Sequence, residues 1–254
     1  MKEQWRLLIT ENNSAHTNMA MDRAELVSIS KGKAPPTVRF FTWKPPAISI
    51  GYFQSLEDEV DLKACKDLGV DYVRRITGGG AVFHDKELTY SIVIPESHNQ
   101  IPKNIMESYG RICGAIIKGL RQLNIESSYV PINDIVANGK KISGNAQTRK
   151  EKTVLQHGTI LIDVDVEEMF SLLIVPNEKI RDKLISDVKQ RVTSIKHILG
   201  KDISFEHVAE AMKIGFEEEF NIELNEGTLN KEEIELTNKF EKDFFSTKEW
   251  NHKR

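Results

Sequence analysis

Strand-like and helix-like segments alternate irregularly over the first 165 residues of this 254-residue chain. Residues 38–42, 47–52 and 70–75 have the composition of short strands, whereas apolar residues recur at helical spacing over 18–30 and 62–68. The regular strand–helix–strand spacing of a parallel α/β sheet is missing. We therefore expect an α+β fold in which helices flank a mixed, largely antiparallel sheet.

The clearest helix is expected over residues 105–123, where apolar side chains recur at steps of three and four. Such a continuous stripe predicts a helix that covers a sheet face. Asn138-Gly139 lies between two apolar segments and predicts a tight hairpin, because both residues tolerate positive φ. From about residue 166 the pattern turns helical, so we expect a single domain over 1–254 whose C-terminal part is a helical cap.

Charge and cysteine usage exclude several classes of protein. The net charge is −3 with both signs interspersed, which does not indicate binding to nucleic acid or to a membrane surface. No apolar run approaches the roughly 18 residues of a membrane span, and the N-terminus lacks a signal-peptide core, so we expect a cytoplasmic protein. Cys65 and Cys113 lie on helical stretches without a Cys-x-x-Cys pair, which predicts free, buried thiols.

The segment from Arg74 to Asp85 is the most informative for chemistry. It contains three successive glycines, whose backbone N–H groups can approach an anion with no side chain in the way, and two preceding arginines that can neutralise it. A flexible turn between Val73 and Val82 is the alternative. The polar residues Thr77 and His84 favour ligand binding, although no Walker or dinucleotide-binding glycine motif is present.

Two further segments carry polar groups on predicted strands. Lys140 and Lys141 follow the hairpin turn, and alternation along a strand sends one of the two toward the protein body. Ile142 and Gly144 favour Lys141 as the inward side chain, whereas full solvation of both lysines is the alternative. His157 begins an apolar strand and is either a structural histidine or a catalytic base.

Taken in order, these segments resemble the lipoate-protein ligase A branch of the biotinyl/lipoyl protein ligase superfamily. The resemblance implies a fold similar to the catalytic core of class II aminoacyl-tRNA synthetases. The matching motifs are Asn18-Met19-Ala20-Met21-Asp22, Ile50-Gly51-Tyr52-Phe53-Gln54, Arg74 to Asp85, Asn133-Asp134-Ile135, Lys141-Ile142-Ser143-Gly144, His157-Gly158-Thr159 and Arg191-Val192-Thr193.

The activity implied by the resemblance is ATP-dependent conversion of lipoate to lipoyl-AMP, followed by lipoyl transfer to a lysine of an acceptor domain. Such acceptors are 2-oxoacid dehydrogenase E2 subunits and the glycine cleavage H protein. The implied roles are catalysis by Lys141; binding of ATP and lipoyl-AMP by Arg74, Gly78, Gly79, Gly80, Ala81, Val82, His84, Asp85 and Lys141; a lipoyl pocket at Gly51, Tyr52, His157, Gly158 and Thr159; and a Mg²⁺ contact at Asp134.

Two alternatives remain open. An octanoyl or lipoyl transferase of the same superfamily would pass the acyl group through a cysteine shortly before the conserved lysine, and the stretch from Tyr129 to Asp134 contains none. A non-catalytic lipoyl- or nucleotide-binding module would not require Lys141. The chain leaves little room for the accessory domain of about a hundred residues that many such ligases carry. We therefore expect a separate accessory subunit and weak adenylation by this chain alone.

Overall fold

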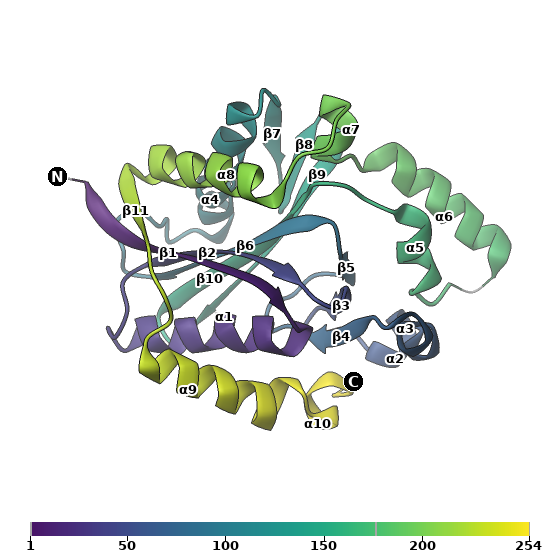
Figure 1. Ribbon diagram of the computed structural model, residues 1–254, viewed down its shortest axis with the longest axis horizontal. Coiled ribbons are helices and arrows are strands. Elements are labelled where there is room, and N and C mark those ends of the chain that lie inside the picture. Colours follow the sequence, from purple (N-terminus) through teal and green to yellow (C-terminus); the bar gives the residue numbers. More distant parts are fainter. Residues whose placement is uncertain (1, 176, 254) are drawn as a thin grey trace.

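The computed structural model describes residues 2–175 and 177–253, which form two sheets and the helices around them (Figure 1). The larger sheet has eight strands in the order β11-β1-β2-β6-β10-β9-β8-β7, and the smaller has three in the order β4-β3-β5. In the larger sheet only the β11–β1 and β1–β2 pairs are parallel, so the predicted mixed, largely antiparallel sheet is confirmed.

The elements are β1 (Glu3–Asn13), α1 (Ala15–Ser30), β2 (Thr37–Trp43), β3 (Ala47–Ile50), α2 (Leu56–Glu59), α3 (Leu62–Leu68), β4 (Asp71–Arg74), β5 (Val82–His84), β6 (Glu87–Pro95), α4 (Ile105–Gln122), β7 (Ser127–Val130), β8 (Asp134–Ala137), β9 (Lys140–Lys150), β10 (Thr153–Leu161), α5 (Val166–Ser171), α6 (Glu178–Arg191), α7 (Ile195–Leu199), α8 (Phe205–Phe220), β11 (Ile222–Glu226), α9 (Lys231–Phe240), the π-helix η1 (Glu241–Phe245) and α10 (Lys248–Asn251).

Helices α4 and α8 cover one face of the large sheet (Figure 1). The predicted helix over 105–123 is confirmed, and its apolar stripe is buried from Tyr109 onward, whereas Ile105 at its start is exposed. The two helices approach closely at Gly215, where an added Cβ would lie 2.3 Å from the carbonyl oxygen of Ala115. Close packing of this kind fixes the helix pair against the sheet.

The opposite face is covered by α1, and α9 packs on the outer side of α1 with α10 beyond it (Figure 1). Ser14 caps α1 by accepting from Thr17 N, so the helix starts before the predicted residue 18. The described chain after residue 166 is mostly helical, as expected, but its helices lie on both faces of the large sheet. The exception is β11, which extends this sheet by pairing with β1; neither of these two strands was predicted.

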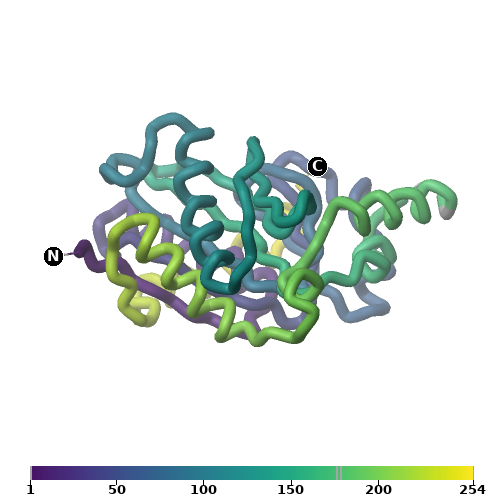
Figure 2. The backbone as a smooth tube through the Cα atoms, turned by 90° about the horizontal axis from the view of Figure 1, so that it is seen from above, coloured from purple at the N-terminus to yellow at the C-terminus, as the bar shows by residue number. Residues whose placement is uncertain are grey.

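The small sheet lies at one end of the large one, near α2, α3 and α5. The glycine segment joins β4 to β5, and the predicted hairpin at Asn138-Gly139 joins β8 to β9 with φ values of 50° and 73°. Helix α6 projects from the body at this same end (Figures 1 and 2). Within residues 2–175 and 177–253, no helix has the length and apolarity needed to span a bilayer.

Candidate active site

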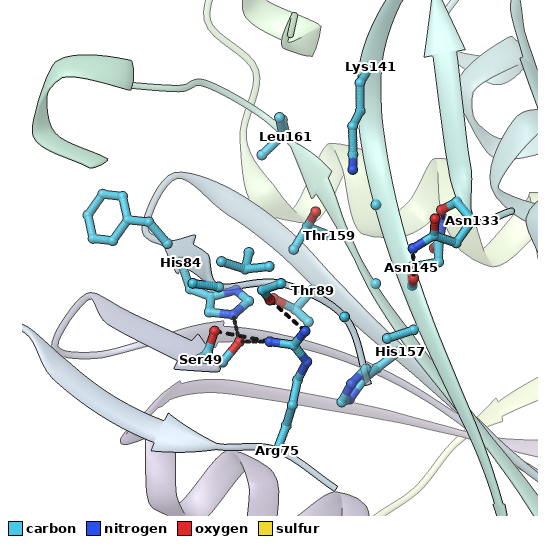
Figure 3. Close-up of a pocket in the computed structure, with 18 of the residues that line it drawn as sticks. Ser49, Arg75, His84, Thr89, Asn133, Lys141, Asn145, His157, Thr159 and Leu161 are labelled. Atoms are coloured by element: carbon cyan, nitrogen blue, oxygen red, sulfur yellow. Dashed lines mark hydrogen bonds between the residues drawn. The ribbon is translucent and has the colours of Figure 1, made fainter. Parts of the chain in front are cut away.

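A cavity of about 330 Å³ lies between β9 and β10 on one side and the small sheet on the other (Figure 3). Apolar side chains dominate its walls and a few polar groups interrupt them, as is usual for a small-molecule site. Segments distant in sequence therefore meet at one place. The predicted residues that line the cavity are Gly79, Gly80, Ala81, Val82, His84, Lys141, His157, Gly158 and Thr159.

Lys141 extends from β9 into this cavity (Figure 3). An added Cβ at Gly144 would lie 2.8 Å from Lys141 Cε, so the glycine leaves room for the lysine side chain. Lys141 Nζ lies 2.6 Å from Asp134 Oδ1, and its side chain is 41% exposed. Its backbone oxygen accepts from Thr193 N at 2.8 Å, which attaches the segment after α6 to the site. The ammonium is therefore held at the cavity and remains accessible.

Arg74 does not line the cavity, which corrects the prediction that it contacts a phosphate. Its guanidinium is fully buried and donates to the carbonyl oxygens of Gly51 at 3.2 Å, Trp250 at 2.9 Å and Asn251 at 2.8 Å. The predicted residues Gly51 and Tyr52 also lie outside the cavity lining. Arg74 thus joins β4 to the turn after β3 and to α10, which is a structural role.

Arg75 takes the position at the cavity that had been expected for Arg74 (Figure 3). Consecutive side chains of an extended segment point to opposite sides, so only one of the two arginines can face the site. Arg75 donates to Ser49 Oγ at 2.9 Å and to the carbonyl oxygens of Gly78 at 2.9 Å and Gly80 at 2.7 Å. Burial lowers the pKa of Arg75 to about 10, which leaves it protonated at neutral pH.

The glycine segment offers unused donors next to this cation. Within the described part of the chain, the amide N–H groups of residues 78–81 donate no hydrogen bond. No carboxylate of the described residues forms an ion pair with Arg75. A buried cation beside free N–H groups is suited to a phosphate or to a developing oxyanion.

Gly51 supports the glycine segment from behind. An added Cβ at Gly51 would lie 2.0 Å from the carbonyl oxygen of Gly79, a residue with φ of +100°. We expect Gly51→Ala to displace the segment and lower activity at least about tenfold, because displacement of about 1 Å at a reacting centre is that costly. Gly110→Ala is the matched control, since its Cβ would lie 3.6 Å from Tyr129. Equal activities of the two variants would contradict this role.

His157 lines the cavity and belongs to a buried polar chain that the sequence did not predict. Its Nδ1 lies 2.8 Å from Asp22 Oδ2, and its Nε2 lies 2.7 Å from Thr77 Oγ1. Burial lowers the pKa of His157, and Asp22 only partly opposes the shift. Arg39 in turn lies 2.7 Å from Asp22 and 3.2 Å from Glu25. The neutral imidazole therefore holds Thr77, at the start of the glycine segment, against the core.

Glu25 makes folding stability depend on pH. Burial raises the pKa of Glu25 from 4.5 to about 8, although Arg39 opposes the shift. A raised pKa means that Glu25 keeps its proton in the folded state at pH values where the unfolded chain has released it. The stabilisation of the folded state by protonated Glu25 is therefore full below pH 4.5 and is lost as pH rises through 8.

The comparison of Glu25→Gln with the parent chain isolates this group, because the amide cannot ionise. Between pH 5 and 8, we expect the stability of the parent chain relative to Glu25→Gln to fall by up to about 1.4 kcal/mol per pH unit. Urea unfolding at several pH values measures it. Parallel pH profiles for the two proteins would contradict the raised pKa.

The other predicted residues lie around the cavity without lining it. Asp134 pairs with Lys141, and among the described residues no group of three or more His, Cys, Asp or Glu side chains could hold a metal ion. Burial raises the pKa of Asp85, whose carboxylate lies 3.7 Å from Lys86 Nζ. The hydroxyl of Tyr52 accepts from Lys253 Nζ at 2.9 Å. The Mg²⁺ contact at Asp134 therefore stays a prediction.

The sequence pattern of the lipoyl protein ligase A/B catalytic domain matches residues 14–217. The chain belongs to this family. It is 40% identical to octanoyltransferase LipM of Geobacillus kaustophilus, over 100% of this chain and 99% of the relative. This result confirms the superfamily resemblance that the sequence motifs indicated.

Two solved structures of the family have the same fold. A chain from an archaeal lipoylation system, a bipartite lipoate protein ligase and its E2 lipoyl domain from Thermoplasma acidophilum, superposes with a TM-score of 0.88 at 31% identity, covering 98% of this chain and 96% of that one. Lipoate-protein ligase A bound with ATP gives 0.84 at 30% identity, covering 98% of both chains. The relatives thus include both octanoyltransferases and lipoate ligases.

Proposed function

We propose that this protein transfers an octanoyl or lipoyl group to a lysine side chain of an acceptor protein. One observation carries the proposal: Lys141, Arg75 and the glycine segment at residues 79–81, whose amides donate no hydrogen bond within the described chain, line a single cavity. The apolar part of its wall, which includes Trp43, Phe83 and Leu161, suits a medium-length acyl chain. Attack on the acyl carbonyl produces negative charge on its oxygen, and fixed cations and N–H donors stabilise that charge.

The donor of the acyl group distinguishes two candidate activities. The likeness to octanoyltransferase LipM favours octanoyl transfer, the alternative to the ligase reaction. The likeness to an ATP-bound lipoate ligase and the cationic, amide-rich end of the cavity support activation by ATP. In the second case, Arg75 and Lys141 would hold the phosphate of ATP and of the acyl-adenylate. Mg²⁺ would then neutralise phosphate charge when bound, with Asp134 as the carboxylate closest to Lys141.

A cysteine-bound acyl intermediate has no support from either thiol. Cys65 and Cys113 are buried in apolar clusters away from the cavity lining. Burial raises the pKa of Cys65 to about 11 and that of Cys113 to about 12, so neither is a thiolate at neutral pH. We expect a Cys65→Ala/Cys113→Ala variant to retain acyl transfer at a rate close to that of the parent. Loss of transfer by a folded double variant would contradict this expectation.

One set of reactions with purified protein and an apo lipoyl domain tests the proposal and its donor. The donors are an octanoyl thioester of acyl carrier protein, synthetic lipoyl-AMP, and lipoate with Mg-ATP. Modification of the acceptor lysine from any donor, measured by intact mass, supports the proposed transfer. Use of the thioester identifies octanoyl transfer, whereas use of lipoate only with Mg-ATP identifies a ligase. No modification from all three donors overturns the proposal.

The bipartite Thermoplasma structure hints at a separate accessory subunit. If the chain is a ligase of that kind, we expect transfer from lipoyl-AMP by this chain alone and little reaction from lipoate and Mg-ATP. Robust lipoylation from lipoate and Mg-ATP without a second protein would contradict the need for a partner.

A further inference from the structure

Ser49 and His84 line the cavity (Figure 3), and Glu87 extends them into a hydrogen-bonded chain of three residues. His84 Nδ1 lies 2.6 Å from Glu87 Oε1, and His84 Nε2 lies 2.7 Å from Ser49 Oγ. The fold creates this arrangement because His84 pairs with Ala47 across β5 and β3, and Ser49 is the next β3 residue on the same face. The result is the carboxylate–imidazole–hydroxyl order of an activated serine.

The imidazole of His84 is held in one orientation. An ionised Glu87 can only accept, so the proton of this hydrogen bond belongs to Nδ1, which leaves Nε2 as the nitrogen that can accept from the hydroxyl of Ser49 when it carries no proton. Trp43 stacks on the imidazole with ring centroids 4.1 Å apart, and its Nε1 donates to Thr89 Oγ1 at 2.7 Å. Thr89 in turn donates to Glu87 at 2.5 Å. This closed set of contacts fixes both the base and its carboxylate.

The surroundings of Ser49 also favour an oxyanion. Arg75 Nη1 donates to Ser49 Oγ at 2.9 Å and places a cation beside the hydroxyl oxygen. Ser49 pairs with Val82 across the small sheet. Residues 79–81, whose amides donate no hydrogen bond within the described chain, directly precede Val82 in the sequence. Cation and amides are therefore close to the place where a carbonyl attacked by Ser49 would develop negative charge.

A second chain of the same type provides an internal contrast. Asp22, His157 and Thr77 repeat the carboxylate–imidazole–hydroxyl order. The carboxylate of Asp22, however, is paired with Arg39, and Thr77 is fully buried and does not line the cavity. Ser49 is only 1% exposed as a residue, but it does line the cavity. Of these two hydroxyls, only that of Ser49 borders the acyl-sized space.

We propose that Ser49 is a nucleophile that accepts the acyl group from a medium-chain thioester. Its oxygen attacks the thioester carbonyl while its proton passes to His84 Nε2. The C–S bond then breaks, an oxygen ester forms, and the leaving thiolate takes the proton from His84. This proposal rests on the proposed acyl transfer and supplies the nucleophile that neither cysteine provides.

The second half of the reaction releases the serine. The neutral amine of the acceptor lysine attacks the ester, the C–O bond breaks, and the amide forms. His84 takes the proton from the amine and returns it to Ser49 Oγ. Without an acceptor, water replaces the amine and the product is the free fatty acid, so a slow thioesterase activity is expected.

The test uses the full chain and the octanoyl thioester of N-acetylcysteamine, without acceptor. We expect a mass increase of one octanoyl group, with fragmentation placing it on Ser49, and no such adduct on Ser49→Ala. Ser55→Ala is the matched control, because Ser55 precedes α2 and its side chain forms no cap hydrogen bond. His84→Gln is expected to slow acylation about 10²-fold or more.

A second variant keeps the proposal testable if Ser49→Ala does not fold. Ser49→Cys should form an adduct that neutral hydroxylamine removes, as a thioester requires. Absence of octanoyl on Ser49 of the parent chain, or equal adduct on folded Ser49→Ala, overturns the proposal. If the parent modifies the acceptor from lipoyl-AMP yet forms no adduct, only the serine proposal fails. If no donor modifies the acceptor, the proposed function fails instead.

Discussion

Lys141→Ala is expected to lower acyl transfer about 10²–10³-fold, the usual loss when a donor to a developing oxyanion is removed. Lys141 and the glycine segment line the same cavity, and Gly144 leaves the space that the lysine side chain occupies. Its replacement removes positive charge where the acyl carbonyl or a phosphate would lie. The loss should be seen with either an octanoyl thioester or lipoyl-AMP, because both donors place a carbonyl there.

Lys140→Ala is the matched control for this experiment. Lys140 is the neighbouring residue on the same turn, does not line the cavity, and donates to the carbonyl oxygen of Lys189 at 3.4 Å. Steady-state rates with a saturating lipoyl domain, together with circular dichroism of each variant, make the comparison. Similar rates for the two alanine variants would show that the ammonium of Lys141 has no part in the reaction.

Arg39→Ala is expected to lower the free energy of unfolding by about 3–5 kcal/mol, as for other buried ion pairs that lose one partner. Arg39 is fully buried and pairs with the carboxylate of Asp22, whereas Glu25, 3.2 Å away, is mostly protonated at neutral pH because its pKa is raised to about 8. Arg39 and His157 hold the pKa of Asp22 below its ordinary value against burial, which raises it. Without the guanidinium, the buried carboxylate of Asp22 keeps the hydrogen bond to His157 as its one side-chain contact of this kind among the described residues.

Arg121→Ala is the control for stability. Arg121 pairs with Glu218 at 3.5 Å, but the side chains are 56% and 43% exposed, so its removal should cost less than about 0.5 kcal/mol. Urea unfolding of both variants at neutral pH measures the difference. A loss below about 1 kcal/mol for Arg39→Ala would mean that the buried carboxylate of Asp22 takes up a proton or water at little cost.

The fold was predictable where the information is local. Helix α4 follows from its apolar stripe, and the β8–β9 hairpin follows from Asn138-Gly139, since both signals act within a few residues. The β11–β1 pair was not predictable in this way. It pairs Glu3 with Ile222, and the local sequence of either strand does not predict which distant strand will be its partner.

The site was predictable in part for the same reason. The glycine segment and Lys141 have recognisable local chemistry, and the structure brings them to one cavity. The choice between Arg74 and Arg75 depended on which side of a short strand faces the cavity, and α10 satisfies Arg74 from the far end of the chain. Sequence spacing does not show that contact.

The sequence by itself determined the family, the sheet class and the two segments that supply positive charge and backbone donors. Only the tertiary structure assigned Arg75 to the cavity and joined Ser49, His84 and Glu87 into one chain. The physical reason is that hydrogen bonds and ion pairs depend on distances of about 3 Å between groups. Such distances between separate segments are set by strand register and packing, which act across the whole chain.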